Sequence, residues 1–529
     1  MSARSLMVLG TASHVGKSVL TTALCRIFAR AGVRVAPFKA QNMSLNSAAT
    51  VDGFEIGRAQ ALQAEAAGLF ATADMNPILL KPESDSCCQV IVQGRIWNKL
   101  SAGDYHLKRV QELFPIVVQS YRRLAENSDL VILEGAGSPA EINLKDGDIV
   151  NMQMAAAADA ACLLVADIDR GGAFASLLGT LELLEAEERQ RIHGFVINKF
   201  RGDMKLLTPG IVEMEKRLRI PCIGVVPYIP DLGLDEEDSV SLESRYGTSR
   251  SAEWREQEER EDKGRKLRIA VVALPYLSNF TDFDALAAEP GVLLRFIQTP
   301  PELERADVII LPGSKRTIQD FRWLQDSGLA NAMIAHQHHK PIIGICGGMQ
   351  MLGLTIEDPH GMESGGEVRG LGLLAIGTVM SKDKITAQVS ARLISDKMFG
   401  IPSEQRETSG YEIHLGETSY HAGAQPLFEL RRFHASHPVI YDGAQSADGR
   451  IWGTYVHGLF DADSFRHAFL RNARMACQLE PRADYAFVAA ERQSRIDRLA
   501  DWVESALDMD TICEWINVPA VHSGVQPGR

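Results

Sequence analysis

A chain of 529 residues is too long for one hydrophobic core, so two or three domains are expected. The net charge of −13 argues against a general nucleic-acid-binding protein, and a content of 45% hydrophobic and 23% charged residues is ordinary for a globular protein. The first residues lack the long apolar core of a signal peptide, the most apolar stretch is too short to span a bilayer, and the eight cysteines have no metal-ligand spacing. We therefore expect a cytoplasmic protein that has no membrane anchor and binds no nucleic acid.

Short apolar runs alternate with longer stretches of helical composition along the first half of the chain. This pattern predicts a doubly wound α/β domain with a mostly parallel sheet, in which ligands bind at the carboxyl ends of the strands. The apolar stretch from Met152 to Val165 is interpreted as a buried helix that leads into a buried strand. The predicted strands are Leu6–Leu9, Val33–Pro37, Leu130–Leu133, Cys162–Ala166, Gly194–Ile197 and Ile223–Val226.

The composition changes over residues 236–266, which are dense in charge and predict a solvated linker. The strand pattern then restarts, so we expect a first α/β domain over 1–235, a second over 267–480, and a C-terminal helix and tail over 481–529. We expect the apolar face of that helix to pack on the second domain. The strands predicted in the second domain are Leu267–Leu274, Val308–Leu311 and Ile342–Ile345, and the apolar face comprises Ile496, Leu499, Ala500 and Val503.

The first predicted strand runs directly into a glycine-rich loop, GTASHVGKS. Counted from Gly10, it is one residue longer than the usual phosphate loop, and counted from Thr11 it lacks the leading glycine. Gly16 lets backbone N–H groups turn toward phosphate, Lys17 supplies a positive charge near the β- and γ-phosphates, and Ser18 is a candidate Mg²⁺ ligand. A plain strand–helix turn is the alternative, but the order of strand, loop and helix favours a site for ATP and Mg²⁺.

Two further loops follow predicted strands of the same domain. Glu134 opens the sequence EGAGS, where a carboxylate at a strand end can reach the same Mg²⁺. Asn198 and Asp203, in NKFRGD, are candidates for hydrogen bonds to the purine base, although such a spacing also arises by chance.

The predicted strand Ile342–Ile345 leads into the sequence GICGGMQ, a sharp nucleophile turn that carries Cys346 in place of serine. A helix N-terminus lowers the pKa of a thiol, and the N–H groups of Gly347 and Gly313 are candidates for binding an oxyanion. A cysteine nucleophile needs a base, for which His457 is the first candidate and His414 the second.

The loop GTASHVGKS and the EGAG sequence together resemble the dethiobiotin synthetase branch of P-loop enzymes, which activate a carboxylate as an acyl phosphate. Residues 267–460 resemble the class I glutamine amidotransferases, which implies that Cys346 forms a glutamyl thioester with His457 as its base. That family usually has a glutamate two residues after the histidine, where this chain has Leu459. The third member of the triad is therefore absent or replaced, and Asp461 is only a weak candidate.

The fused order and the segment QNMSLNS make nearly the whole chain similar to the cobyric acid synthase family. This resemblance implies ATP- and glutamine-dependent amidation of the b, d, e and g carboxylates of adenosylcobyrinic acid a,c-diamide. Candidates for contacts to the corrinoid substrate are Gln41, Asn42, Asn46 and Asp146, with a capping loop and a solvated turn as the alternatives. The competing functions are a cobyrinic acid a,c-diamide synthase, a CTP synthase-like enzyme and a partition-type ATPase, the last disfavoured by Cys346 and His457.

Overall fold

The computed structural model describes residues 3–84, 87–229, 265–363, 365–433 and 439–521. The chain forms two compact units, which are described separately below. The N-terminal unit comprises Met1–Ser44, Ile56–Glu237 and Arg492–Arg529, and the C-terminal unit comprises Leu45–Glu55 and Asp238–Glu491. The predicted linker over 236–266 lies, apart from its last two residues, outside the described residues.

The N-terminal unit is built on a six-stranded sheet in the order β12-β11-β10-β1-β9-β2, in which every pair of neighbours is parallel. The predicted doubly wound sheet is confirmed, as is the helix that leads into β10. The strands are β1 (Arg4–Gly10), β2 (Val35–Phe38), β9 (Leu130–Glu134), β10 (Ala161–Asp167), β11 (Ile192–Phe200) and β12 (Cys222–Pro227).

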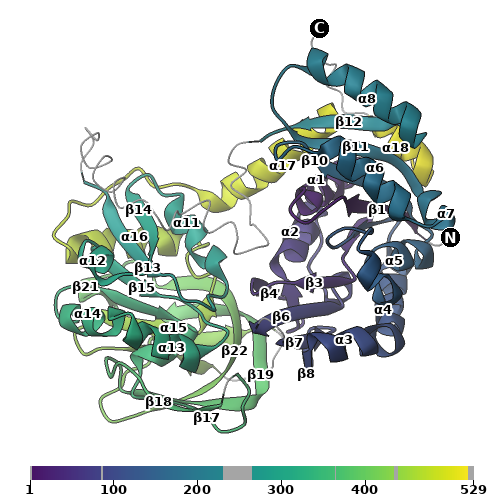
Figure 1. The fold of residues 1–529 in the computed structure, drawn as a ribbon. Helices are drawn as coiled ribbons and strands as arrows, with labels where there is room; N and C mark the ends of the chain where they lie inside the picture. Colours follow the sequence, from purple (N-terminus) through teal and green to yellow (C-terminus); the bar gives the residue numbers. More distant parts are fainter. Residues whose placement is uncertain (1–2, 85–86, 230–264, 364, 434–438, 522–529) are drawn as a thin grey trace. The chain divides into compact units, whose positions relative to one another are not determined.

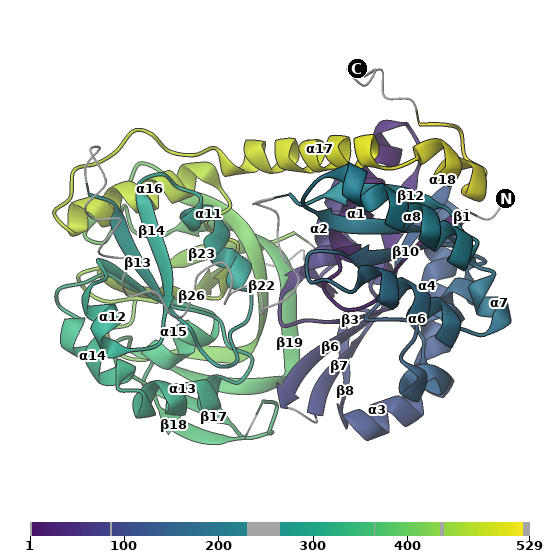
Figure 2. The same cartoon turned by 45° about the horizontal axis from the view of Figure 1, so that its top comes forward.

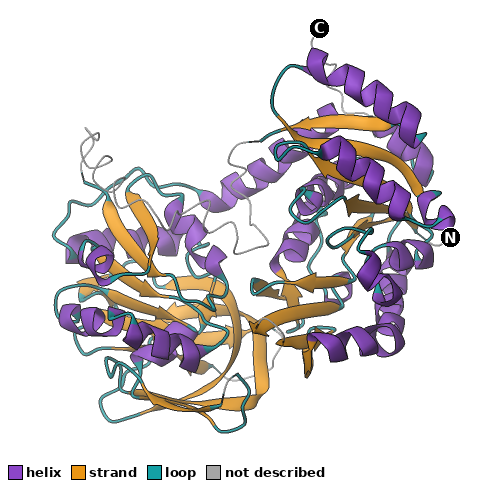
Figure 3. Ribbon diagram, viewed as in Figure 1, coloured by secondary structure: helices purple, strands orange, loops and turns teal. Residues whose placement is uncertain are grey.

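Helices cover both faces of this sheet (Figure 3). Successive residues of a strand point to opposite faces, so Leu6 and Val8 join one apolar cluster while Met7 and Leu9 join another. The first cluster includes α1 (Lys17–Arg30), α17 (Val488–Ala506) and α18 (Met509–Ile516). The second includes α4 (Phe114–Asn127), α5 (Met152–Ala157), α6 (Ala173–Leu183) and α8 (Met204–Leu218).

The C-terminal helix packs differently from the prediction. Its apolar residues join the same cluster as α1, so the expectation that it covers the second domain is wrong. Ion pairs between Arg26 and Asp497 (2.7 Å) and between Arg30 and Asp501 (2.6 Å) line the contact, and Figure 2 shows α17 lying along α1. The apolar residues concerned are Ile496, Leu499, Ala500 and Val503.

A second, four-stranded sheet in the order β3-β6-β7-β8 extends the N-terminal unit and was not predicted. Its first strand lies within the segment QNMSLNS, and the sheet precedes the long helix α4 in the chain. Its strands are β3 (Gln41–Met43), β6 (Ile78–Ser84), β7 (Cys87–Val92) and β8 (Arg95–Ser101), and α2 (Arg58–Ala66) and α3 (Ala102–Lys108) lie beside it in sequence.

The C-terminal unit contains a six-stranded sheet in the order β14-β13-β15-β16-β26-β25, which is parallel except for the pair β25–β26 (Figure 1). The predicted strands are confirmed as β13, β15 and β16. The strands are β13 (Leu267–Val272), β14 (Val292–Ile297), β15 (Val308–Leu311), β16 (Ile342–Ile345), β25 (Ala444–Gln445) and β26 (Ile451–Thr454). The helices beside them in the chain are α11 (Asp284–Ala287), α12 (Pro300–Glu304), α13 (Thr317–Asp326), α14 (Leu329–His336), α15 (Gly347–Leu352) and α16 (Asp463–Ala476).

A second sheet of this unit is mostly antiparallel and has seven strands, with the long pair β19–β22 at its centre. The prediction of doubly wound domains did not include it. Its strands are β17 (Thr355–Asp358), β18 (Gly366–Arg369), β19 (Ile376–Leu393), β22 (Glu407–Tyr420), β23 (Phe428–Arg432), β24 (Ile440–Asp442) and β27 (Val456–His457). In the described ranges, none of the helices combines the length and the apolar character that crossing a bilayer requires.

Candidate functional site

The glycine-rich loop lies between the end of β1 at Gly10 and the start of α1 at Lys17, as predicted. Gly16 has a φ of 98°, and a Cβ atom added there would lie 2.1 Å from the side chain of Asn198, so only glycine fits. The Lys17 ammonium donates hydrogen bonds to the carbonyl oxygens of Ala12 (2.9 Å) and Gly137 (3.0 Å). The cation is thereby held within the loop, at the N-terminus of a helix, where phosphate binding is favoured.

The carboxylate of Glu134, at the end of β9, is buried beside this loop. It accepts a hydrogen bond from the Ser18 hydroxyl (2.8 Å). The same carboxylate pairs with the Lys39 ammonium (2.9 Å) and accepts a hydrogen bond from the Gln63 amide (2.6 Å). Neither Lys39 nor Gln63 has a distinct signal in the sequence, because Lys39 follows β2 and Gln63 lies on α2, both remote from Glu134 in the chain.

The other residues predicted to bind the nucleotide, Thr11, Asn198 and Asp203, have different structural roles. The Asn198 amide donates to the carbonyl of Val15 (2.8 Å), so this side chain braces the glycine-rich loop. The N–H of Thr11 donates to the carbonyl of Val165 (2.9 Å) at the start of the loop. Asp203 is exposed and caps α8 by accepting from the N–H of Lys205 (2.8 Å). A base contact by Asn198 or Asp203 stays a prediction.

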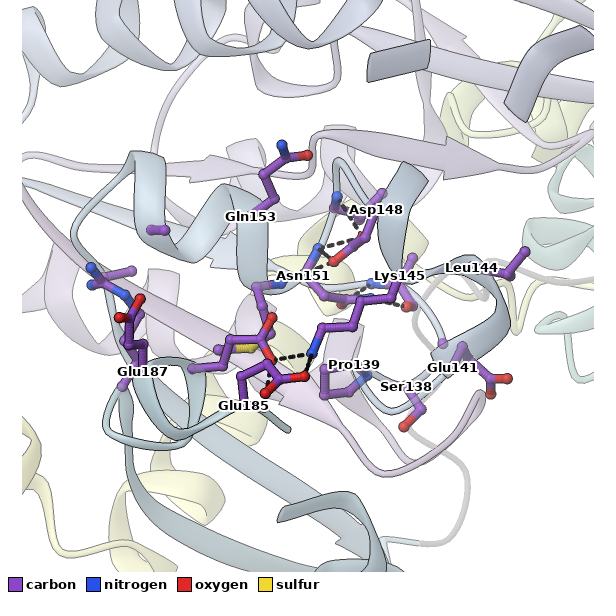
Figure 4. Close-up of a pocket in the computed structure, with 18 of the residues that line it drawn as sticks. Ser138, Pro139, Glu141, Leu144, Lys145, Asp148, Asn151, Gln153, Glu185 and Glu187 are labelled. Atoms are coloured by element: carbon purple, nitrogen blue, oxygen red, sulfur yellow. Dashed lines mark hydrogen bonds and ion pairs between the residues drawn. The ribbon is translucent and has the colours of Figure 1, made fainter. Parts of the chain in front are cut away.

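A pocket opens on the N-terminal unit (Figure 4). Its volume of about 1210 Å³ exceeds the range of about 300–1,000 Å³ that is typical of small-molecule sites. Gly137 lines one part of this pocket, and its carbonyl oxygen accepts the hydrogen bond from Lys17. Lys145 lies in its wall, paired with Glu188 at 2.8 Å and with Glu185 at 3.2 Å, and Figure 4 shows this cluster. The rest of the lining mixes polar and apolar residues in similar measure, so the pocket suits a large ligand that presents both kinds of surface.

The four predicted substrate residues are not brought together. Gln41 and the exposed Asp146 both line the pocket. Asn42 is buried, and its amide donates to Gln60 (2.9 Å). Asn46 is also buried but belongs to the C-terminal unit.

The predicted nucleophile turn is present between β16 and α15. Cys346 has φ 51° and ψ −112°, a conformation that is strained for a residue with a side chain and is typical of functional sites. A Cβ atom added at Gly348 would lie 1.8 Å from the carbonyl oxygen of Leu311, which explains why the turn needs glycine. The thiol lies at the N-terminus of α15, 3.8 Å from the carbonyl oxygen of Ile413.

His457 is buried at the end of β27, and its ring meets a carboxylate through Nδ1. Nδ1 lies 2.6 Å from a carboxylate oxygen of Asp282, and the other oxygen of Asp282 accepts from the N–H of Gly458 (2.9 Å). Nε2 meets no hydrogen-bond partner of normal geometry within the described residues. Burial lowers the pKa of His457, but the Asp282 carboxylate, with the nearby Cys346 thiol, raises the pKa to about 10. Cys346, His457 and Asp282 therefore have the arrangement of a nucleophile–base–acid triad.

Asp282 was missed by the sequence analysis. The residue two places beyond the histidine is Leu459, which is fully buried, and Asp461 is not the carboxylate that meets Nδ1 of His457. The acid instead comes from η4 (Phe280–Phe283), a short turn that follows β13. The available signal was a carboxylate soon after the carboxyl end of a parallel strand, the edge where ligands bind in such sheets.

The two glycines predicted to bind an oxyanion lie beside this triad. A Cβ atom added at Gly313 would be 3.2 Å from Cε1 of His457, and one added at Gly347 would be 3.0 Å from the backbone nitrogen of Ser314. The N–H of Gly347 belongs to the first turn of α15, where N–H groups have no partner within the helix. Asp320 accepts from the Ser314 hydroxyl (2.6 Å) and so fixes the Gly313 loop.

His414, the second candidate base, occupies another position. Its Nδ1 lies 2.9 Å from the carbonyl oxygen of Gly416 and its Nε2 lies 3.4 Å from Glu412. The ring stacks on Tyr455 with centroids 3.8 Å apart. Both nitrogens of His414 thus have other partners, and His457 is the histidine that faces the acid of the triad.

Comparison with known proteins matches two family models to this chain. A family model described as the CobQ/CobB/MinD/ParA nucleotide binding domain matches residues 6–241, and one described as the CobB/CobQ-like glutamine amidotransferase domain matches residues 268–465. A cobyric acid synthase of Sorangium cellulosum is 50% identical over 520 residues, with 96% of this chain and 98% of that protein covered. One of Moorella thermoacetica is 48% identical over 510 residues, with 96% of each chain covered. One of Citrobacter koseri is 47% identical over 517 residues, with 96% of this chain and 97% of that protein covered.

Proposed function

The chain belongs to the cobyric acid synthase family, and on this premise we propose that it amidates the b, d, e and g carboxylates of adenosylcobyrinic acid a,c-diamide with ATP and glutamine. The observation that carries the proposal is that one chain contains both a strained cysteine turn with a histidine–aspartate pair and a glycine-rich loop with a buried lysine. The first suits glutamine hydrolysis and the second suits phosphoryl transfer from a nucleotide.

In the C-terminal unit, the proton of the Cys346 thiol rests on Nε2 of His457, which the Asp282 carboxylate holds as an imidazolium, and the thiolate attacks the carboxamide carbon of glutamine. The N–H groups of Gly313 and Gly347 stabilise the oxyanion that forms. The imidazolium returns its proton to the departing nitrogen, so ammonia leaves and a thioester remains. Water then attacks the thioester, releasing glutamate and restoring the thiol.

In the N-terminal unit, an oxygen of the corrinoid carboxylate attacks the γ-phosphorus of ATP, and ADP leaves. Lys17 neutralises the negative charge that shifts between the phosphates during the transfer. Backbone N–H groups of the loop hold the phosphate oxygens. Ammonia then attacks the acyl phosphate carbon and expels phosphate, which leaves the amide. Ammonia released into water would be protonated and lose its nucleophilicity, so the proposal requires transfer that is sheltered from solvent.

Ser18 and Glu134 are the residues that we assign to Mg²⁺. A hydroxyl and a carboxylate in hydrogen-bond contact are hard oxygen donors, and phosphate and water complete such a site. The described residues contain no group of three or more His, Cys, Asp or Glu side chains that would bind a metal without a substrate. The chemical contribution of the ion would be neutralisation of charge on the transferred phosphate.

Gln41 and Asp146 are the residues that we propose to contact the corrinoid, because both line the large pocket of the N-terminal unit. The buried amide of Asn42 instead holds the local chain, and Asn46 has a place in the other unit. The function is tested by mass spectrometry of the products formed from adenosylcobyrinic acid a,c-diamide, ATP and glutamine. Four successive amidations are expected; no corrinoid product, or amination of UTP in its place, would contradict the proposal.

The carboxylate of Asp282 is expected to set the basicity of His457. Because the pKa of His457 is raised to about 10, the imidazolium persists at neutral pH and is lost as the pH rises through that value. Asp282→Asn keeps the shape but removes the charge, so the pKa should fall toward its ordinary value and the alkaline limb of glutamine hydrolysis should move to lower pH. The value of kcat/KM should fall on the order of 10²-fold.

The measurement is glutamate release between pH 6 and about pH 10.5. This range includes the ordinary pKa of histidine, 6.5, and the raised pKa of His457, about 10. Asp461→Asn is the matched control, since it removes the same charge from a carboxylate beside Gly458, the residue after His457, whose Cβ position would lie 3.3 Å from Oδ2 of Asp461. A wild-type pH profile in Asp282→Asn, or an equal loss in Asp461→Asn, would contradict the assignment.

A further inference from the structure

The segment Leu45–Glu55 belongs to the C-terminal unit although it lies within the N-terminal part of the sequence. The chain leaves the N-terminal unit after Ser44 and returns to it at Ile56. In between it forms a short hairpin of β4 (Ser47–Ala49) and β5 (Glu55–Gly57), closed by a hydrogen bond from the N–H of Thr50 to the carbonyl of Phe54 (2.7 Å). The C-terminal unit is thus assembled from two separate stretches of chain.

Buried polar contacts fix the segment to the long strand β19. Glu55 is 1% exposed, accepts from the Ser47 hydroxyl (2.8 Å) and forms an ion pair with Lys384. The Gln388 amide donates to the carbonyl oxygen of Ala49 (3.1 Å). A buried carboxylate that lost its cation would be costly, so this attachment is specific in register and not a loose surface contact.

The segment also reaches the turn that carries the acid of the triad. The N–H of Ser47 donates to the side-chain oxygen of Asn279 (3.0 Å), and this hydrogen bond is buried. Asn279 has a φ of 52° and immediately precedes η4, and its own carbonyl accepts from the N–H of Asp282 (3.0 Å). A left-handed residue whose side chain is anchored holds the backbone that presents Asp282 to His457.

A second contact touches the strand that lines the thiol. Ala49 packs with Tyr411 and Ile413 in one small apolar cluster. Tyr411 stacks on the His457 ring, with centroids 5.4 Å apart and planes 22° apart, and the carbonyl of Ile413 faces the Cys346 thiol. Two independent contacts therefore lead from Leu45–Glu55 to the residues around the nucleophile.

We propose that Leu45–Glu55 is a working part of the glutaminase, and that the hydrogen bond from Ser47 to Asn279 positions Asp282 and hence the His457 ring. This inference rests on the proposed function. Asn279 is a positioning residue, since it acts through Asp282 and not on the substrate. Glutamine hydrolysis in this chain accordingly depends on a segment that the N-terminal half supplies.

The test compares two substitutions of Asn279 in the full-length chain. Asn279→Gly tolerates the left-handed backbone but lacks the acceptor, whereas Asn279→Asp keeps the acceptor. In Asn279→Gly, kcat for glutamine hydrolysis should fall on the order of tenfold with little change in KM, because only the geometry of the base is disturbed. Asn279→Asp should restore most of kcat, and amidation with free ammonia should remain at the wild-type rate in both.

Asn517→Gly is the matched control, because Asn517 is also left-handed, with a φ of 49°, and lies at the end of α18. Ser47→Pro removes the donor from the other side of the same bond together with the hydroxyl that donates to Glu55, so it is compared with Ser47→Ala, which loses only the hydroxyl. Relative to Ser47→Ala, Ser47→Pro should add nothing to the loss already present in Asn279→Gly. Wild-type hydrolysis by Asn279→Gly, failure of Asn279→Asp to restore kcat, or additive losses would overturn the inference. A wild-type chain that released no glutamate would overturn the proposed function and this inference together.

Discussion

Cys346→Ala is expected to abolish amidation supported by glutamine and to leave amidation supported by free ammonia intact. The thiol is the nucleophile of the hydrolytic half, and removing a nucleophile of this kind lowers the rate on the order of 10³-fold or more. Ammonia supplied from solution bypasses that half, while the glycine-rich loop and Glu134 still activate the carboxylate. The strained backbone at Cys346, with its φ of 51°, indicates that the position is kept for chemistry and not for packing.

The measurement for this prediction is corrinoid amide formation with each nitrogen donor, followed by mass spectrometry. Cys477→Ala is a suitable control, because Cys477 is a free, partly buried cysteine of the same unit that lies outside the triad. It should behave as the wild type with both donors. Loss of ammonia-supported synthesis in a folded Cys346→Ala protein would contradict the division of labour between the units.

Lys17→Ala is expected to lose synthesis with either nitrogen donor and to retain glutamine hydrolysis. The Lys17 ammonium is held by carbonyl oxygens of two loops, 2.9 Å from Ala12 and 3.0 Å from Gly137, so it is placed before a nucleotide binds. Removing a preorganised charge that stabilises a transferring phosphate costs on the order of 10²-fold or more. The substitution acts before nitrogen enters the reaction, so the source of nitrogen makes no difference.

Rates of ADP formation and of amide formation measure this effect directly. Lys216→Ala removes an exposed lysine of α8 in the same unit and should leave both rates unchanged. Normal synthesis by Lys17→Ala would exclude the assigned phosphate site. Loss of glutamine hydrolysis as well would show that Lys17 has a role beyond that site.

The positions of Cys346 and of the glycine-rich loop could be predicted because their signals are local. Each turn requires glycine within a few residues of the functional side chain, and the strand before it and the helix after it have clear apolar patterns. Asp282 could not be predicted in the same way, since it is 175 residues from His457 in the sequence. β13 belongs to the parallel sheet and β27 to the mostly antiparallel one, so only the tertiary fold brings Asp282 beside His457.

The contacts between segments that are far apart in the chain also could not be predicted from the sequence. The apolar face of α17 predicts that the helix is buried on one side, but periodicity carries no information on which core it joins. Likewise, nothing local in Leu45–Glu55 indicates that Glu55 pairs with Lys384, because that contact spans more than 300 residues of chain. Burial of a charge beside its partner decides the location of this segment, and only tertiary structure shows the partner.

The most direct test of the central claim follows the nitrogen atom. Wild-type protein is supplied with glutamine labelled with ¹⁵N in the amide, unlabelled ammonium in solution, ATP and the corrinoid a,c-diamide, and the amide products are analysed by mass spectrometry. If ammonia released at the Cys346 site reaches the acyl phosphate without mixing with the solvent, the new amides carry ¹⁵N. Amides that carry the unlabelled nitrogen of the solution would contradict the account.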